Sequence, residues 1–162
     1  MKRVLLIVLV ILSFSLVFWK NSLSQDEERW QYIGNDVSGI EWYYDKASLN
    51  WLSDNIVEVW TKQIFTTEKA KKEMIKDLID LGVPPAKAKK IYKTFALLEI
   101  DIKNQKYKIL HIDCYDKKDN ILYSVETFKI SIPITPGGMD ETLWEFMLLE
   151  KLNKILETEN SD

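Results

Sequence analysis

Alternating apolar and polar positions predict short strands along most of the chain after residue 29. The alternation is clearest in residues 56–65, where Val57 and Val59 fall on one side and Glu58 and Lys62 on the other. Such a segment is typical of an antiparallel sheet with one wet side. Comparable segments, separated by turn-forming residues, predict further strands at residues 30–33, 39–45, 94–103, 106–116 and 121–129.

Apolar residues at spacings of three and four predict a helix at residues 67–81. A second, short helix is expected at residues 86–93. The last helix is expected to begin at Asp140 and to end near residue 157. Runs of strands followed by a helix favour the α+β class. We therefore expect an antiparallel sheet of about six strands with the C-terminal helix packed on it.

The N-terminus has the order of an export signal. Two cations within the first three residues precede sixteen residues without a charge. Small residues allow cleavage after Ser24, whereas an uncleaved segment would anchor the chain in the inner membrane through residues 1–20. Both alternatives stay open. The chain is thus divided into a signal peptide or membrane anchor, residues 1–24, and one domain, residues 25–162.

Charge narrows the class of partner. The 162 residues carry 22 basic and 25 acidic side chains, a net charge of -3. Without residues 1–24, which hold three of the basic side chains, the net charge becomes -6. Binding to nucleic acid needs a clustered excess of Lys and Arg, so we expect no nucleic-acid partner.

Few residues are available for a metal or a cofactor. One Cys and one His cannot build a structural zinc site of four Cys/His ligands, and one Cys cannot form an intrachain disulfide. The glycine pair Gly137-Gly138 lacks the spacing of a phosphate-binding loop. We expect no metal and no cofactor.

The single histidine raises the alternative of a small hydrolase. His111 and Asp113 fall on one side of a predicted strand, where they offer a base and an orienting carboxylate to a Ser or Cys nucleophile. Cys114 falls on the other side with Ile112, and a buried free Cys behaves as a small hydrophobe. We expect Cys114 to be a core residue and the enzyme alternative to be the weaker one.

The aromatic residues give the candidate binding surface. Trp42, Tyr43 and Tyr44 are consecutive in a predicted strand, so Tyr43 faces away from its two neighbours. Aromatics on both faces of a one-sided sheet cannot all be core. Together with Trp60 they are candidates for contact with a protein or glycan partner. The alternatives are burial within the fold or within a homodimer.

The order of several short motifs resembles the bacterial surface-adhesin protein E family. The resemblance covers most of residues 30–150 and rests on WQYIGNDVSGIEWYYDKASLN, NIVEVWTKQIF, a Lys-rich helix ending in LG, FALLEIDIKNQKYKIL, CYDKKDNIL and ISIPITPGGMDETLWEFM. It implies an exported protein with an antiparallel sheet and a helix packed on it. The family is named for a member that binds host extracellular-matrix proteins, and many other members are uncharacterised periplasmic or surface proteins.

One departure from the family concerns a disulfide. The resemblance implies a Cys within the segment matching residues 99–103 and a second in the final helix, paired with each other. Here the corresponding positions are Ile102 and a residue near Leu148. Two apolar residues can replace such a bridge by packing, at a loss of roughly 2–4 kcal/mol of restraint on the unfolded chain.

These observations together predict an exported, non-enzymatic binding protein of the cell envelope, located in the periplasm or on the cell surface. The alternative is an envelope protein that stays tethered to the inner membrane and has a structural or assembly role. No binding residue is carried over from the family.

Overall fold

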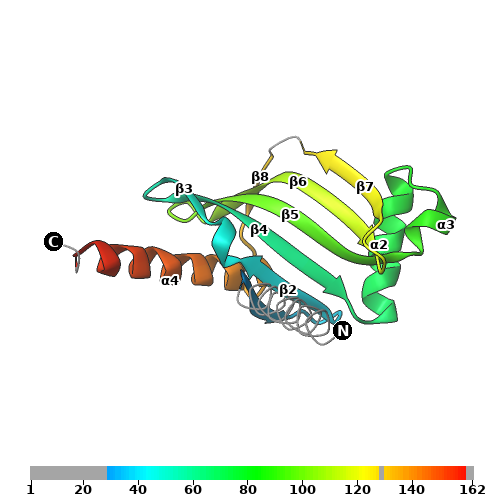
Figure 1. Cartoon of the computed structure of the whole chain (residues 1–162), viewed down its shortest axis with the longest axis horizontal. Helices are drawn as coiled ribbons and strands as arrows, with labels where there is room; N and C mark the ends of the chain where they lie inside the picture. The colour runs from blue at the N-terminus through cyan, green and yellow to red at the C-terminus, as the bar shows by residue number, and fades with distance from the viewer. Residues whose placement is uncertain (1–28, 128–129, 160–162) are drawn as a thin grey trace, which may run out of the picture.

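The computed structural model describes residues 29–127 and 130–159, which form an antiparallel sheet with helices on one face (Figure 1). The predicted α+β class and the C-terminal helix are confirmed. The sheet has eight strands where about six were expected. They are β1 (Trp30–Asn35), β2 (Ile40–Asp45), β3 (Asn50–Ser53), β4 (Ile56–Phe65), β5 (Ile91–Asp101), β6 (Lys106–Asp116), β7 (Ile121–Glu126) and β8 (Ser131–Pro133).

The helices begin and end close to the expected residues. They are α2 (Glu68–Asp80), α3 (Pro85–Ala88) and α4 (Met139–Glu159), with a 3-10 turn η1 (Lys46–Ser48). Thr67 caps α2 by accepting a hydrogen bond from the Ala70 amide at 3.1 Å. The predicted helix at residues 86–93 is too long, because β5 already begins at Ile91.

The strand order is β1-β2-β4-β5-β6-β7, and each of the two short strands shares a long neighbour. On β4, residues near Ile56 pair with β3 and residues 61–65 pair with β2. On β6, residues 106–108 pair with β8 and residues 111–115 pair with β7. The three long strands β4, β5 and β6 therefore form the centre of the sheet.

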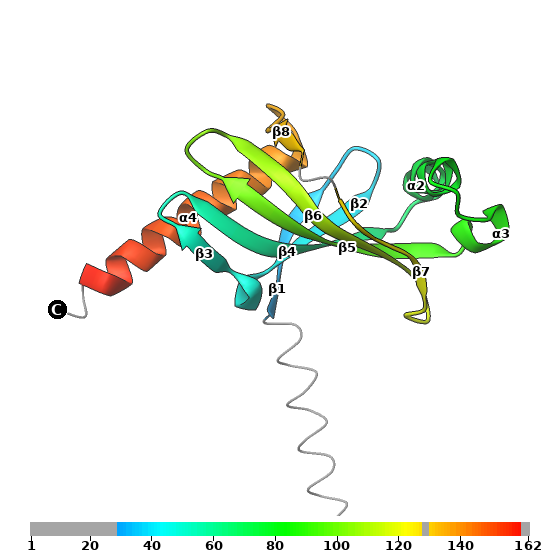
Figure 2. The same ribbon diagram turned by 90° about the horizontal axis from the view of Figure 1, so that it is seen from above.

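Two hydrophobic clusters lie on the same face of the sheet, which we call the helix face. At one end, Leu143 and Met147 of α4 pack with Val57 and Val59 of β4. At the other end, Leu78 of α2 packs in a cluster with further buried residues of the strands and α3. Figure 2 shows α4 and α2 at opposite ends of the sheet. The middle of the helix face lies between them.

The opposite face, which we call the open face, carries no cluster of buried hydrophobic residues within residues 29–127 and 130–159. Its paired strand residues are half-buried or exposed, except Asp45. Asp45 is fully buried and accepts hydrogen bonds from Arg29 Nε at 2.7 Å and Nη2 at 2.5 Å. Asp45 also accepts a hydrogen bond from the Ala47 amide at the start of η1.

The C-terminal half of α4 extends beyond the sheet (Figure 1). The apolar side of a surface helix normally packs against the core. A second apolar side of α4 is nevertheless exposed. Its members are Leu149, Leu152, Ile155 and Leu156, which are 43–56% exposed. In the described part of the chain, no helix is both long and apolar enough to cross a membrane. The predicted signal or anchor, residues 1–24, lies outside the described residues.

The two positions proposed to replace a disulfide lie in one cluster. Ile102 is 4% exposed, and Leu148 is partly buried against the cluster to which Ile102 belongs. The Trp144 indole of α4 donates a hydrogen bond to the Ile102 carbonyl at 3.0 Å. The helix is therefore joined to this end of the sheet by packing and by one hydrogen bond.

Candidate functional site

The four aromatic residues singled out from the sequence do not form one surface. Tyr43 pairs with Lys62 and Tyr44 with Thr61, so Trp42 and Tyr44 lie on the helix face and Tyr43 on the open face. Trp60 also lies on the open face. The alternation of side chains along a strand therefore divides the four aromatic residues between the two faces of the sheet, as expected from the sequence.

Burial removes Tyr44 from the candidate surface. Its side chain is 3% exposed and packs against Phe146 of α4, with ring centroids 5.7 Å apart. Its hydroxyl donates a hydrogen bond to Glu150 at 2.7 Å, and Lys46 lies 3.1 Å from the same carboxylate. Burial, followed by this hydrogen bond, raises the pKa of Tyr44. Tyr44 is a core residue that fixes α4 to β2.

The open face carries a row of aromatic rings in two contacting groups. The Trp30 ring of β1 lies 5.4 Å from Phe95 of β5, and Phe95 lies 5.5 Å from Tyr115 of β6. At the edge of the sheet, Tyr32 contacts Tyr43 at 5.3 Å. These rings come from four strands, so the row crosses most of the sheet. The sequence could not show that Trp30, Phe95 and Tyr115 join it, because they are 20 or more residues apart.

Lysine side chains lie over these rings. The Lys62 ammonium is 4.6 Å from the Trp30 ring and 4.3 Å from the Tyr43 ring, within the range of a cation–π contact. The Tyr43 hydroxyl donates to Glu41 at 2.8 Å. Burial, then the Glu41 hydrogen bond, raises the pKa of Tyr43 to about 12. The phenol is thus neutral across the physiological range.

Trp60 contacts the histidine considered for catalysis. Its ring lies 5.9 Å from His111 in an edge-on arrangement. His111 Nε2 is 3.0 Å from Asp113 Oδ1 and 3.5 Å from the hydroxyl of Ser124. Both contacts therefore use the same ring nitrogen. A catalytic relay needs the nucleophile and the carboxylate on different nitrogens of the ring, and the contacts of His111 do not have this geometry.

Cys114 is separated from His111 by the sheet itself. It pairs with Thr94 on the helix face and is 2% exposed, which confirms the prediction of a core residue. Burial, followed by the charge of Asp113, raises the pKa of the Cys114 thiol to about 11. A neutral buried thiol is a poor nucleophile. Within residues 29–127 and 130–159, no group of three His, Cys, Asp or Glu residues is placed to hold a metal ion.

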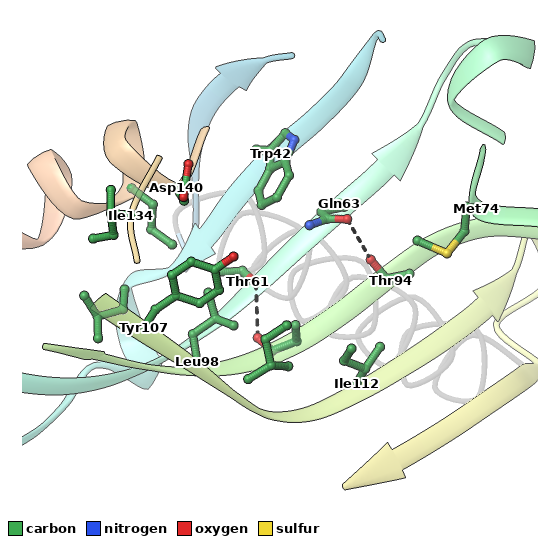
Figure 3. A pocket seen from close by; sticks show the side chains of 14 residues that line it. Trp42, Thr61, Gln63, Met74, Thr94, Leu98, Tyr107, Ile112, Ile134 and Asp140 are labelled. Carbon is green, nitrogen blue, oxygen red and sulfur yellow. Dashed lines mark hydrogen bonds between the residues drawn. The ribbon is translucent and has the colours of Figure 1, made fainter. Parts of the chain in front are cut away.

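A cleft that the sequence did not predict lies on the helix face between α2 and α4 (Figure 3). Its floor is formed by the central strands and its ends by Met74 of α2 and Leu143 of α4. The β5–β6 pairing shifts at Leu110, which is an extra residue of β6, so that both Ile109 and Ile112 line the cleft. Trp42 closes one side, and its indole nitrogen is buried without a hydrogen-bond partner in the described chain.

Comparison with protein-family models and with curated proteins finds no match for this chain. The resemblance to the surface-adhesin protein E family stays a prediction from the sequence.

Proposed function

We propose that this chain is an exported, non-enzymatic binding protein of the cell envelope that contacts a protein or glycan partner through its open face. The observation that carries the proposal is the row of aromatic rings and lysines on that face. Aromatic side chains supply large, rigid contact areas and are enriched at the centres of interfaces. Of the four residues chosen from the sequence, Tyr43 and Trp60 belong to this surface.

The chemistry of the open face suits a mixed polar and apolar partner. Acidic and basic side chains alternate with the rings, and several already pair, such as Lys108 with Glu99 at 2.5 Å. A partner would therefore meet rings and partly neutralised charges in place of a field of one sign. The rings are also held by one another and by Lys62, which limits the entropy lost on binding.

Export is supported by the sequence of residues 1–24 and by the resemblance. Cell fractionation should find the protein in the envelope fraction, in the periplasm or on the cell surface. N-terminal sequencing then separates the two envelope hypotheses. Gln25 as the first residue would eliminate the tethered alternative, whereas an intact Met1 would support it. Recovery of the chain only from the cytoplasm would refute export.

Binding is tested with matched substitutions of aromatic residues. Trp60→Ala and Tyr43→Ala remove rings from the open face, and Trp51→Ala removes a half-buried ring that packs on the α4 cluster. A panel of extracellular-matrix proteins and glycans is presented to the full chain and to each variant. For a bound member of the panel, we expect both open-face variants to lose about 30-fold in affinity, the scale of an interface hot spot.

The control makes the result specific. Trp51→Ala should retain binding, because its ring is not part of the open face. Circular dichroism and urea unfolding establish that each variant is folded before binding is measured. Equal binding by the wild type, Trp60→Ala and Tyr43→Ala would show that the open face is not the contact surface.

A further inference from the structure

The cleft between α2 and α4 has the size and lining of a small-molecule site. Its volume is about 230 Å³. The lining is mainly aliphatic, with Ala96, Ile109 and Ile112 on the floor. A dry apolar cavity of about 150 Å³ accommodates benzene, so this cleft has room for two fused rings or for one ring with a short substituent.

Besides the Trp42 indole, two polar side chains at the cleft offer a free hydrogen-bonding group to a ligand. The Thr94 hydroxyl donates to Gln63 Oε1 at 3.3 Å, which leaves the Gln63 amide nitrogen turned away from Thr94 and toward the interior (Figure 3). Tyr107 supplies a hydroxyl from the opposite wall. Across the described residues, neither the Gln63 amide nitrogen nor the Tyr107 hydroxyl has a hydrogen-bond partner. The Thr61 hydroxyl is already used, because it donates to the Ala96 carbonyl at 3.1 Å.

Charge limits the kind of ligand. Of the described residues that line the cleft, Asp140 at the start of α4 is the one carboxylic acid, and its carboxylate accepts a hydrogen bond from the Thr135 amide at 2.7 Å. Burial, followed by the charge of Asp140, raises the pKa of Tyr107. The phenol therefore stays a neutral donor, and a carboxylate on the ligand would be repelled by Asp140.

We infer that this cleft binds a small neutral molecule with an apolar ring body and one hydrogen-bond acceptor, such as a carbonyl oxygen. The ring body lies on the aliphatic floor between Met74 and Leu143. The acceptor receives a hydrogen bond from the Gln63 amide or the Tyr107 hydroxyl. This site is on the face opposite the proposed partner surface and does not depend on it.

Three probes that share one ring system test the inference by equilibrium dialysis against the full chain. 2-Acetylnaphthalene has the ring body and the acceptor, 2-ethylnaphthalene lacks the acceptor, and 2-naphthoate carries a negative charge. We expect 2-acetylnaphthalene to bind about fivefold more tightly than 2-ethylnaphthalene, the effect of one neutral hydrogen bond. 2-Naphthoate should bind at least about tenfold more weakly than the ketone, because of Asp140.

Substitutions assign the binding to the cleft. Ala96→Phe fills the floor and should weaken binding of 2-acetylnaphthalene at least about tenfold by occupying the ring site. Ala86→Phe makes the same change at an exposed position of α3 and should leave binding unchanged. Gln63→Leu should reduce the preference for the ketone over the ethyl compound. The open-face variant Trp60→Ala should bind the probe as the wild type does, so the two sites can fail separately.

Retention of the probe at equal affinity by the wild type and Ala96→Phe would overturn the inference, because binding would then lie elsewhere on the chain. Failure of all three probes to bind the folded wild type would also overturn it. If Ala96→Phe does not fold, Met74→Trp fills the same cleft from α2 and replaces it in the comparison.

Discussion

Leu97 and Leu98 are neighbours in β5 and occupy two different environments. Leu98 is 7% exposed and belongs to the cluster that α4 covers on the helix face. Leu97 is half-buried on the open face, where it pairs with Trp60 and His111. One face is thus protected by a second layer of structure, and the other by the side chains that lie on it.

The two faces also differ in their side-chain chemistry. Aliphatic residues predominate on the helix face, because close packing against a helix requires shapes that interdigitate. Rings and lysines predominate on the open face, and the aliphatic stem of Lys62 covers apolar surface while its ammonium stays over the rings. Fold stability should therefore depend mainly on the helix face, and recognition on the open face.

Replacing the two adjacent leucines tests this division most strongly. Leu98→Ala should lower the free energy of unfolding by about 3 kcal/mol, because it leaves a cavity in the covered cluster. Leu97→Ala should cost about 1 kcal/mol, since water reaches its position. Urea unfolding followed by circular dichroism measures both. Equal losses for the two variants would mean that the open face is as tightly packed as the helix face.

Thiol chemistry distinguishes the faces by rate. Cys114 is buried with a raised pKa, so at pH 8 its reaction with a disulfide reagent should be at least about 100-fold slower than that of an exposed cysteine. Ser124→Cys supplies that reference on the open face of β7, close to His111. We expect the variant to show one fast and one slow thiol in a stopped-flow assay. Rapid modification of Cys114 in the wild type would show that the helix face opens readily.

Substitutions of the adjacent Tyr43 and Tyr44 should show the smallest difference in stability between the two faces. At neutral pH, Tyr44→Phe should cost about 1 kcal/mol through the lost hydrogen bond to Glu150. Folding raises the pKa of Tyr43 from 10.0 to about 12, so above about pH 10 the folded chain keeps a proton that the unfolded chain loses. The free energy of unfolding therefore falls as the pH rises from about 10 toward 12. Tyr43→Phe should make that fall shallower when urea unfolding is repeated across this range, and an unchanged slope would contradict the assignment.

Much of the fold follows from local patterns. The predicted bounds of β4 and β6 match the structure because their alternation persists over ten residues or more. Thr67 marks the start of α2 because its side chain accepts a hydrogen bond from a free amide of the first turn. Asp140 marks the start of α4 because negative charge is favourable in the first turn of a helix. The strands β3 and β8 were not predicted, because four and three residues are too few to show a period of two.

The candidate sites were less accessible from the sequence. Alternation correctly divides Trp42 and Tyr44 from Tyr43, but it does not say which side a helix covers. That choice depends on where α4 packs, and α4 is distant in sequence from β2. The cleft depends in addition on the separation of α2 and α4 and on the extra residue Leu110 in β6. Neither the helix separation nor the extra residue can be recognised from a short stretch of sequence.

Because side chains alternate along β4, mutation can change the two faces of this strand independently. Odd-numbered positions such as Thr61 and Gln63 face the cleft, and even-numbered positions such as Trp60 and Lys62 face the row of rings. A single codon change in this strand therefore modifies one surface and leaves the side chains of the other in place. During evolution, the open face can therefore change its binding partner while the helix face stays under selection for packing.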